Sequence, residues 1–264
     1  MHNIIKALNY QTRRDNFLYY AILAGLGVIS LSIVLYLETG KFENLTGGYA
    51  AAMIGGDGNC SFAAVLSSLL LATRICGWDY ADKTMNYEIL SGHSRRDVYW
   101  SRVISCLSWC MITTMLVCTL PVAVLTLING WGEQMPLKGC LLRYVLLIFP
   151  VFRTICEYML ITFLTKSCYA GMVVGFLFTE FTGVLGMILT EEKILECTWH
   201  SSFTNITELF TFNMEMGYID GKDVEVFLTD LDPSLAAGTI IASLVTGIAC
   251  ILIGYLVFRK SDVN

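Results

Sequence analysis

Long apolar runs separated by short polar segments dominate the sequence. Each of the six longest runs has about 20 residues, enough for a helix to cross roughly 30 Å of hydrocarbon. This pattern predicts an all-α polytopic membrane protein that forms a single transmembrane domain over residues 1–264. The predicted spans are 17–37, 58–75, 103–128, 141–164, 168–189 and 236–258.

Two shorter stretches near the start of the chain have less certain roles in this pattern. Within residues 1–16, Ile4, Ile5 and Leu8 fall on one helical face, and basic residues fall elsewhere. This spacing predicts an interfacial helix on the membrane surface, although a basic flank that only fixes orientation would also fit. Residues 47–56 are apolar but glycine-rich, which predicts a loop or a re-entrant piece.

A polar, charged segment at residues 79–102 separates the second and third spans. Asp79 and Asp82 can cap a first short helix, and Gly92 is suited to end it. Ser94 then opens an S-x-x-D capping box, which predicts the start of a second helix. A basic loop on one side of the membrane would explain the charge of this segment but not two capped helices.

The charges are sorted along the chain in a way that predicts orientation. Basic residues flank the spans at the N-terminus, in the segment 79–102, at Lys166 and at the C-terminus, and with six spans these positions share one side. The excess of Lys and Arg in cytoplasmic loops therefore places both termini in the cytoplasm and the chain in the cell membrane. The acidic segment 190–234 then lies outside the cell, where we expect short helices that cover the outer face.

Composition narrows the function classes. The chain is 55% hydrophobic and only 15% charged, with a mean hydropathy of +0.62. Its net charge of -5 argues against a nucleic-acid partner. Most of the ten cysteines lie inside the apolar runs without metal-ligand spacing, so they predict packing and no metal site.

Candidate chemistry within the chain is sparse. The sequence has no G-x-x-x-x-G-K-[ST] motif, which predicts that the chain is not an enzyme that hydrolyses nucleotide and that it binds no cofactor itself. Arg153 and Glu157 are charged residues inside a predicted span, four positions apart, so they share a helical face and can pair. Such a pair either fixes helix packing or serves function, and both interpretations stay open.

The segment 79–102 resembles the coupling loop of ABC-2 type permeases, the membrane subunits of many bacterial ABC exporters. The resemblance lies in the order of residue types from a polar start through a short helix and a Gly turn to a basic and an aromatic residue. These positions are Asp82, Lys83, Thr84, Glu88, Ile89, Leu90, Ser91, Gly92, Arg95, Tyr99 and Trp100. The plan of six spans with a large outer segment between the last two is also similar, so the resemblance covers nearly the whole chain.

The resemblance implies a cytoplasmic coupling helix that docks on a separate ATPase subunit, which would bind ATP and Mg²⁺ in two copies. The residues expected to couple are Asp82, Lys83, Glu88, Gly92, Arg95 and Tyr99. It also implies a second permease, identical or homologous. The permeases of this size that the chain resembles expel antimicrobial peptides such as lantibiotics and bacitracin, so an amphipathic substrate is expected.

Two other functions remain open at this stage. A membrane sensor or assembly protein would use the acidic outer segment 190–234 as a binding module and would transport nothing. An ion-coupled secondary transporter would need an inverted repeat and ionisable residues near a broken helix. The sequence has no such repeat, and Arg153 and Glu157 are the only notable charged pair within a span.

Overall fold

The computed structural model describes residues 1–264 except 39–45, 57, 82–83, 192–198, 220–221 and 261–264. Helices account for most of the described residues, with one two-stranded hairpin near the C-terminal third. The elements are α1 (His2–Arg14), α2 (Asn16–Glu38), α3 (Gly47–Gly56), α4 (Asn59–Ala81), α5 (Thr84–Leu90), α6 (Arg95–Asn129), α7 (Leu137–Thr165), α8 (Cys168–Glu191), α9 (Ser202–Leu209), β1 (Asn213–Ile219), β2 (Lys222–Leu228) and α10 (Pro233–Lys260).

Six of the described helices are long and apolar enough to cross a membrane, as the hydropathy pattern predicted. They are α2, α4, α6, α7, α8 and α10, so each predicted span corresponds to one helix. The main differences are at the ends. Helix α4 continues to Ala81, beyond the predicted end at residue 75, and α6 begins at Arg95, ahead of the predicted start at residue 103.

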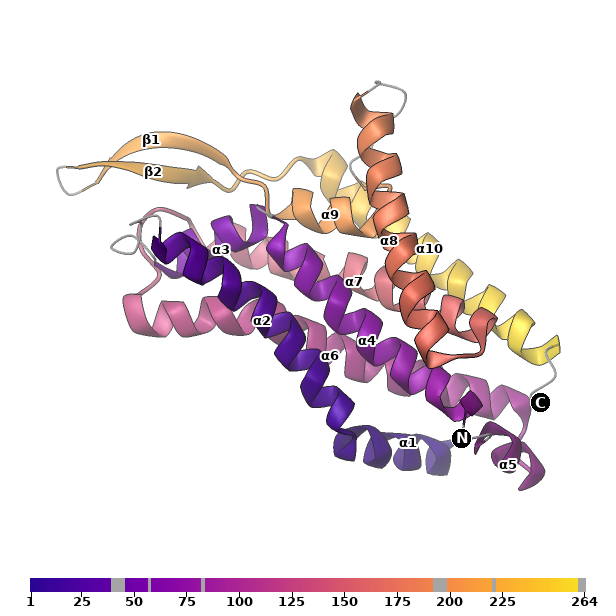
Figure 1. Cartoon of the computed structure of the whole chain (residues 1–264). Helices are drawn as coiled ribbons and strands as arrows, with labels where there is room; N and C mark the ends of the chain where they lie inside the picture. Colours follow the sequence, from indigo (N-terminus) through magenta and orange to yellow (C-terminus); the bar gives the residue numbers. More distant parts are fainter. Residues whose placement is uncertain (39–45, 57, 82–83, 192–198, 220–221, 261–264) are drawn as a thin grey trace.

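Helices α4 and α7 lie in the middle of the bundle, and α2, α6, α8 and α10 pack around them (Figure 1). Small residues allow the helices to approach closely. Such residues are common at helix contacts in membrane proteins, because lipid leaves no hydrophobic driving force for helix association. Gly175 of α8, for example, lies against Leu69 of α4 and Tyr158 of α7. A buried hydrogen bond of 2.6 Å between the hydroxyls of Tyr158 and Thr179 also joins α7 to α8.

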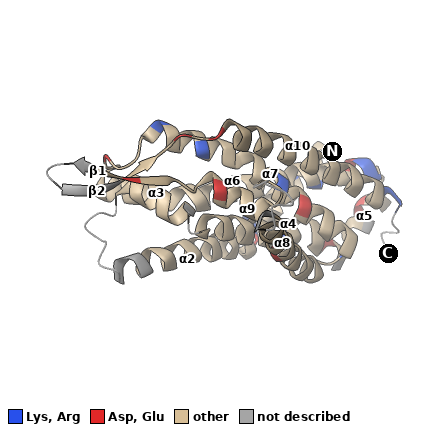
Figure 2. Cartoon of the chain, turned by 90° about the horizontal axis from the view of Figure 1, so that it is seen from above, with Lys and Arg blue, Asp and Glu red and all other residues tan. Residues whose placement is uncertain are grey.

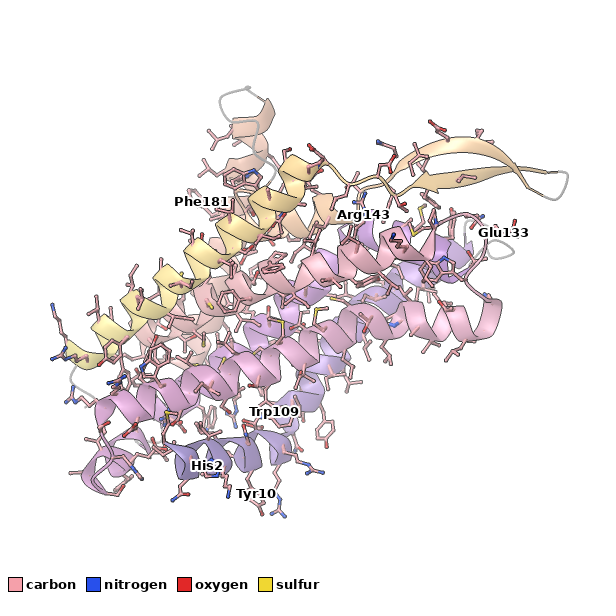
Figure 3. All side chains as sticks on the ribbon, turned by 180° about the vertical axis from the view of Figure 1, so that it is seen from behind. His2, Tyr10, Trp109, Glu133, Arg143 and Phe181 are labelled. Carbon is pink, nitrogen blue, oxygen red and sulfur yellow. The ribbon has the colours of Figure 1, made fainter. Side chains whose placement is uncertain are left out.

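Helix α1 buries its apolar face against protein. Ile4 and Leu8 are buried, and α1 packs on α6. The Asn9 carboxamide oxygen accepts hydrogen bonds from the Ser105 hydroxyl and the Trp109 indole, at 2.9 and 3.1 Å. The apolar face of α1 therefore packs against another helix of the same chain, and its opposite face is exposed (Figure 3).

Residues 47–56 form a helix, which corrects the interpretation as a loop. Helix α3 has only ten residues, about 15 Å, so it is too short to span a membrane. It is buried between its neighbours because glycines bring it close to α6. Gly47 lies against Thr126, and Gly48 lies against Trp131.

The segment 190–234 contains strands as well as a short helix of the kind expected. Helix α9 fits the expectation, but β1 and β2 form an antiparallel hairpin with Asn213 opposite Leu228. The Phe227 amide donates to the Gln134 carbonyl at 2.8 Å, and the Phe227 ring contacts Tyr49, which fixes the base of the hairpin. The rest of the hairpin extends away from the helices (Figure 1).

Both termini and α5 lie at one end of the bundle, and the hairpin lies at the other (Figure 1). Much of the described Lys and Arg is near the first end (Figure 2). Because the chain begins and ends at the same end of the bundle, the arrangement agrees with an even number of spans. The basic residues there are Lys6, Arg13, Arg14, Arg74, Arg95, Arg96, Arg102, Lys166, Arg259 and Lys260.

Candidate functional site

Helix α5 forms a separate short element between the end of α4 and the start of α6. It ends in a glycine-centred motif in which the Gly92 amide donates to the Ile89 carbonyl at 3.1 Å and the His93 amide donates to the Glu88 carbonyl at 3.3 Å. Gly92 has φ of +96°, a conformation that side chains disfavour. The predicted helix terminator is thus confirmed, with a defined geometry.

The predicted capping box at Ser94 is also confirmed. The Ser94 hydroxyl accepts a hydrogen bond from the Asp97 amide at 3.1 Å and donates to the Asp97 carboxylate at 2.9 Å. This cap begins α6, a continuous helix of 35 residues that runs from this end of the bundle to the other. The second predicted helix and the third predicted span are therefore one element.

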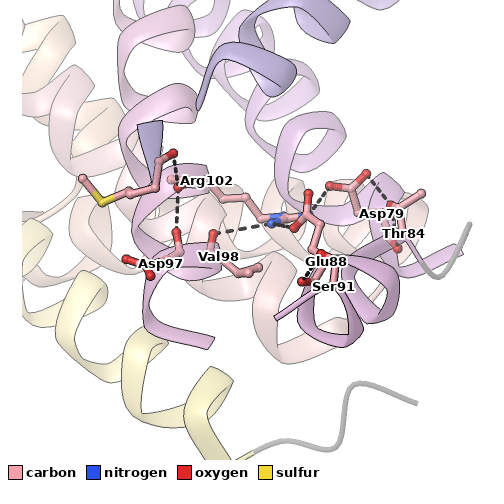
Figure 4. Close-up of polar contacts among 9 residues, drawn as sticks. Asp79, Thr84, Glu88, Ser91, Asp97, Val98 and Arg102 are labelled. Atoms are coloured by element: carbon pink, nitrogen blue, oxygen red, sulfur yellow. Dashed lines mark hydrogen bonds and ion pairs between the residues drawn. The ribbon is translucent and has the colours of Figure 1, made fainter. Parts of the chain in front are cut away.

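A buried arginine holds α5 to the bundle (Figure 4). Arg102 of α6 donates through Nη2 to Asp79 of α4 and through Nη1 to Glu88 of α5, each at 2.7 Å. Its side chain is 0% exposed, whereas those of Asp79 and Glu88 are 7% and 26% exposed. One cation thus joins three helices, which makes the position of α5 depend on a buried charge cluster.

Asp79 has a different role from the one predicted. It lies in the last turn of α4 and forms an ion pair with Arg102, so it does not begin a new helix. Its other carboxylate oxygen accepts a hydrogen bond from the Thr84 hydroxyl at 2.9 Å, at the first residue of α5. The carboxylate therefore connects α4 to both following helices.

The outward face of α5 is apolar. Tyr87 and Leu90 are 69% and 81% exposed, and they are three positions apart, so they lie on one side of the helix. Met85 points the other way and is fully buried. An exposed aromatic and aliphatic pair on a helix that is fixed from behind is a suitable contact for another protein.

The residues predicted to couple are not all at this surface. Asp82 and Lys83 lie outside the described residues. Gly92 is exposed, and Arg95 is partly exposed and donates to the Arg259 carbonyl at 3.2 Å. Tyr99 is 1% exposed, so it is positioned to join helices within the chain.

Tyr99 connects α6 to α10. Its hydroxyl donates to the Ile251 carbonyl at 2.6 Å, and its ring contacts those of Phe163, Tyr255 and Phe258. Gly254 lies next to the hydroxyl, so α10 approaches closely. Movement at the start of α6 would therefore be transmitted to the last span.

The second candidate site is the charged pair in α7, which forms as predicted. Arg153 Nε donates to Glu157 at 2.8 Å, and both side chains are 10% exposed. The guanidinium also donates to the carbonyls of Trp199 and His200 at 3.1 and 2.6 Å. The other Glu157 oxygen accepts a bond from the Ser202 hydroxyl at 3.3 Å.

These bonds hold the segment at residues 199–202 between two spans. Trp199 lies against Gly238 of α10, and His200 lies against Gly186 of α8. A Cβ atom at either glycine would overlap the neighbouring ring. Arg153 therefore holds part of the connection between α8 and α9 in place between α8 and α10.

A third buried cation, Arg143, fixes α9 and the hairpin to α7 (Figure 3). It donates to the carbonyls of Leu209 and Asp230 at 2.6 and 3.1 Å, and its guanidinium lies 4.3 Å from the centre of the Phe212 ring. These contacts join the end of α9 and the exit of the hairpin to the bundle.

The described residues contain no group of three or more His, Cys, Asp or Glu side chains placed to hold a metal ion. Cys106 and Cys110 come within 3.7 Å of each other through their sulfurs, but both are fully buried in the apolar interior. They fit the role of small packing residues.

Sequence reasoning missed the importance of Arg102, which was counted among the basic flanking residues. One signal was available, because Arg102 lies two turns after the Ser94 cap and is followed by the apolar run of the same helix. The contacts of Arg153 and Arg143 with backbone carbonyls leave no comparable signal, since any residue can supply a carbonyl.

Comparison with known proteins gives no relative of this chain: no protein-family profile, no curated protein and no solved structure matches it. The geometry of these sites and the resemblance of the segment at residues 79–102 are therefore the observations that bear on function.

Proposed function

We propose that this chain is the membrane-spanning permease subunit of an ATP-driven exporter of the ABC-2 type. The observation that carries the proposal is α5, a short helix that exposes Tyr87 and Leu90 while Arg102 fixes it to α4 and α6. A docking helix needs exposed side chains, because a partner must reach its surface. It also needs firm attachment to the bundle, because its movement must be transmitted to the other helices. The missing nucleotide-binding motif is expected of such a subunit.

The proposed mechanism is rigid-body coupling. An ATPase subunit binds ATP and Mg²⁺, closes, and pushes on α5. The ion pairs of Arg102 carry this displacement into α4 and α6, and Tyr99 carries it from α6 to α10. Two ATPase copies and a second permease, identical or homologous, complete the exporter, and its substrate is an antimicrobial peptide or another amphipathic molecule.

The charge distribution supports the proposed orientation. The basic end of the bundle, with both termini and α5, faces the cytoplasm, where an ATPase is available. The end with α9 and the hairpin faces outward. In this orientation α5, which lies in the segment that resembles a coupling loop, is on the cytoplasmic side.

The test is purification of the tagged protein in mild detergent from its native host, followed by mass spectrometry and an ATPase assay. We expect a nucleotide-binding subunit to co-purify with the wild-type chain. The double variant Tyr87→Ser/Leu90→Ser should lose at least 90% of it, because the outward face of α5 becomes polar.

Tyr169→Ser is the matched control. Tyr169 is 67% exposed, close to the 69% of Tyr87, and lies at the start of α8 on the same end of the bundle. Equal loss with Tyr169→Ser would contradict a specific docking surface on α5. A wild-type preparation without any ATPase would contradict the transporter proposal.

The hairpin gives one observation in favour of the alternative function, a membrane sensor with an outer binding module. Met214 and Met216 on β1 are 57% and 72% exposed and lie on one face of the strand. Flexible methionine side chains suit binding surfaces that accept several partners. An ATPase-free complex with an outer protein in the same purification would favour this function.

A further inference from the structure

An apolar groove runs between α6 and α7 at the end of the bundle opposite to both termini. Its volume is about 450 Å³, within the range of roughly 300–1,000 Å³ that is usual for sites that bind small molecules. It opens sideways between two helices that are each long and apolar enough to cross a membrane. The residues that matter most in its lining are Thr119, Ala123, Leu127, Trp131, Leu141 and Tyr144.

Three polar groups in the lining, those of Thr119, Thr126 and Trp131, already donate hydrogen bonds to backbone carbonyls. The hydroxyl of Thr119 donates to the Met115 carbonyl at 2.7 Å, within its own helix. The hydroxyl of Thr126, also in the lining, donates within α6 at 2.7 Å, and the Trp131 indole donates to the Met135 carbonyl at 2.6 Å. The groove therefore suits an occupant that needs contact area and few hydrogen bonds.

The surface on both sides of the groove is of the kind that faces lipid. Val124 of α6 is 43% exposed, and Leu142 and Val145 of α7 are 51% and 56% exposed. The groove thus opens directly onto the hydrocarbon that these side chains require. An alkyl chain can enter it without leaving an apolar environment.

The length of the groove corresponds to one leaflet. On α6 the lining runs from Thr119 to Leu127, about 12 Å of helix, and on α7 from Leu137 to Tyr144, about 10 Å. Half of the hydrocarbon core measures about 15 Å. Leu137 is the first residue of α7 in the lining, and the next residue, Lys138, is exposed, so a cation is available at this end of α7 for a phosphate at the membrane surface.

We propose that this groove is a binding site for a membrane phospholipid, with one acyl chain between α6 and α7 and the phosphate next to Lys138. The lipid fills a defect in the packing of α6 against α7 and joins their outer halves. This proposal does not depend on transport, so its test is independent of the test for docking at α5.

Native mass spectrometry of the purified protein tests the proposal directly. After extensive washing in detergent, we expect one retained phospholipid for each wild-type chain. Ala123→Trp places an indole in the groove at an exposed position and should reduce retention at least fivefold. Val124→Trp, one residue further on the lipid-facing surface and outside the lining, should retain the lipid.

Circular dichroism and size-exclusion chromatography establish that both variants fold. Equal retention of phospholipid by Ala123→Trp and the wild-type chain would overturn the proposal, as would a wild-type chain without lipid. A groove occupied by a second copy of this chain would also overturn it, and in that case Ala123→Trp would convert a dimer into a monomer.

A second measurement needs no substitution that fills the groove. Wild-type protein is reloaded in detergent with one equivalent of a phospholipid whose acyl chains carry bromine, which quenches nearby tryptophans. The quenched fraction should fall by at least half in Trp131→Phe, since Trp131 lines the groove. The same quenched fraction in both proteins would place the lipid elsewhere.

Discussion

Two buried arginines lie at different levels of the bundle, and their partners differ in kind. Arg102 has two carboxylates, Asp79 and Glu88, and its side chain is 0% exposed. Arg153 has one carboxylate, Glu157, and two backbone carbonyls, and it is 10% exposed. The first cluster has more negative than positive charge, whereas the second is balanced.

This difference shows which parts of the chain each arginine holds in position. Arg102 joins α4 and α5 to α6 through the carboxylates of Asp79 and Glu88, within 23 positions, and its bond to a backbone carbonyl, that of Val98 at 3.4 Å, stays within α6. Arg153 reaches residues 46 and 47 positions away through their main chain. The Arg102 cluster therefore fixes a helix through specific residue types, while Arg153 fixes the path of a connection whatever side chains it carries.

The largest expected effect comes from Arg102→Met. This change leaves the buried carboxylate of Asp79 and the partly exposed carboxylate of Glu88 without a cation, and breaking a buried pair costs about 3–5 kcal/mol. We expect a lower melting temperature in detergent and protease cleavage next to α5. Arg96→Met, at an exposed position nearly two turns earlier in the same helix, is the control and should leave both readouts unchanged. A variant at Arg102 as stable as the control would show that α5 is held by other contacts.

Arg153→Met should have a smaller effect, on the order of 3 kcal/mol, because only one carboxylate loses its cation and Ser202 still donates to it. The released segment at residues 199–202 should become accessible to protease while α5 remains protected. Differential scanning fluorimetry and limited proteolysis measure the two results.

Removal of both partners sharpens the contrast. Arg153→Met/Glu157→Met should recover most of the lost stability, because an apolar pair replaces a buried ion pair at little cost. Arg102→Met/Glu88→Met should recover much less, since Asp79 stays buried and unpaired. Equal recovery at the two sites would contradict the distinction drawn from their charge balance.

The smallest effect is expected for Gly92→Ala. A side chain at φ of +96° costs about 1–2 kcal/mol, and no atom blocks the added methyl group. The melting temperature should fall slightly, and co-purification of an ATPase should fall with it if the angle between α5 and α6 matters for docking. Gly27→Ala is the matched control, since it also meets no neighbouring atom but lies within α2.

Local patterns predicted the elements that depend on local chemistry. Hydropathy located the six long helices, and the Ser94 and Gly92 signals located the boundary between α5 and α6. The hairpin was not predicted because the excess of acidic residues in 190–234 is typical of a solvated surface, whereas the strand signal, the alternation of apolar and polar residues, covers only the short stretch 222–228.

The candidate sites were predictable only in part, because their contacts are long-range. The pairing of Arg153 with Glu157 follows from helical spacing, but its bonds to residues 199 and 200 do not. Tyr99 was expected near a docking surface because of the resemblance to ABC-2 permeases, yet packing against α10 buries it. The partners of Arg102 depend on how α4 and α6 cross, which no local pattern specifies.

The unbroken run of α6 has a mechanical consequence. With 35 residues it is about 50 Å long, so it can act as a lever whose fulcrum lies within the bundle. A rotation of about 5° around the midpoint moves each tip by about 2 Å in opposite directions, the size of the helix shifts by which many switches operate. A push at the Ser94 tip would thus appear reversed at the Gly130 tip if α6 moves as one rigid body through Pro121, the proline within the helix.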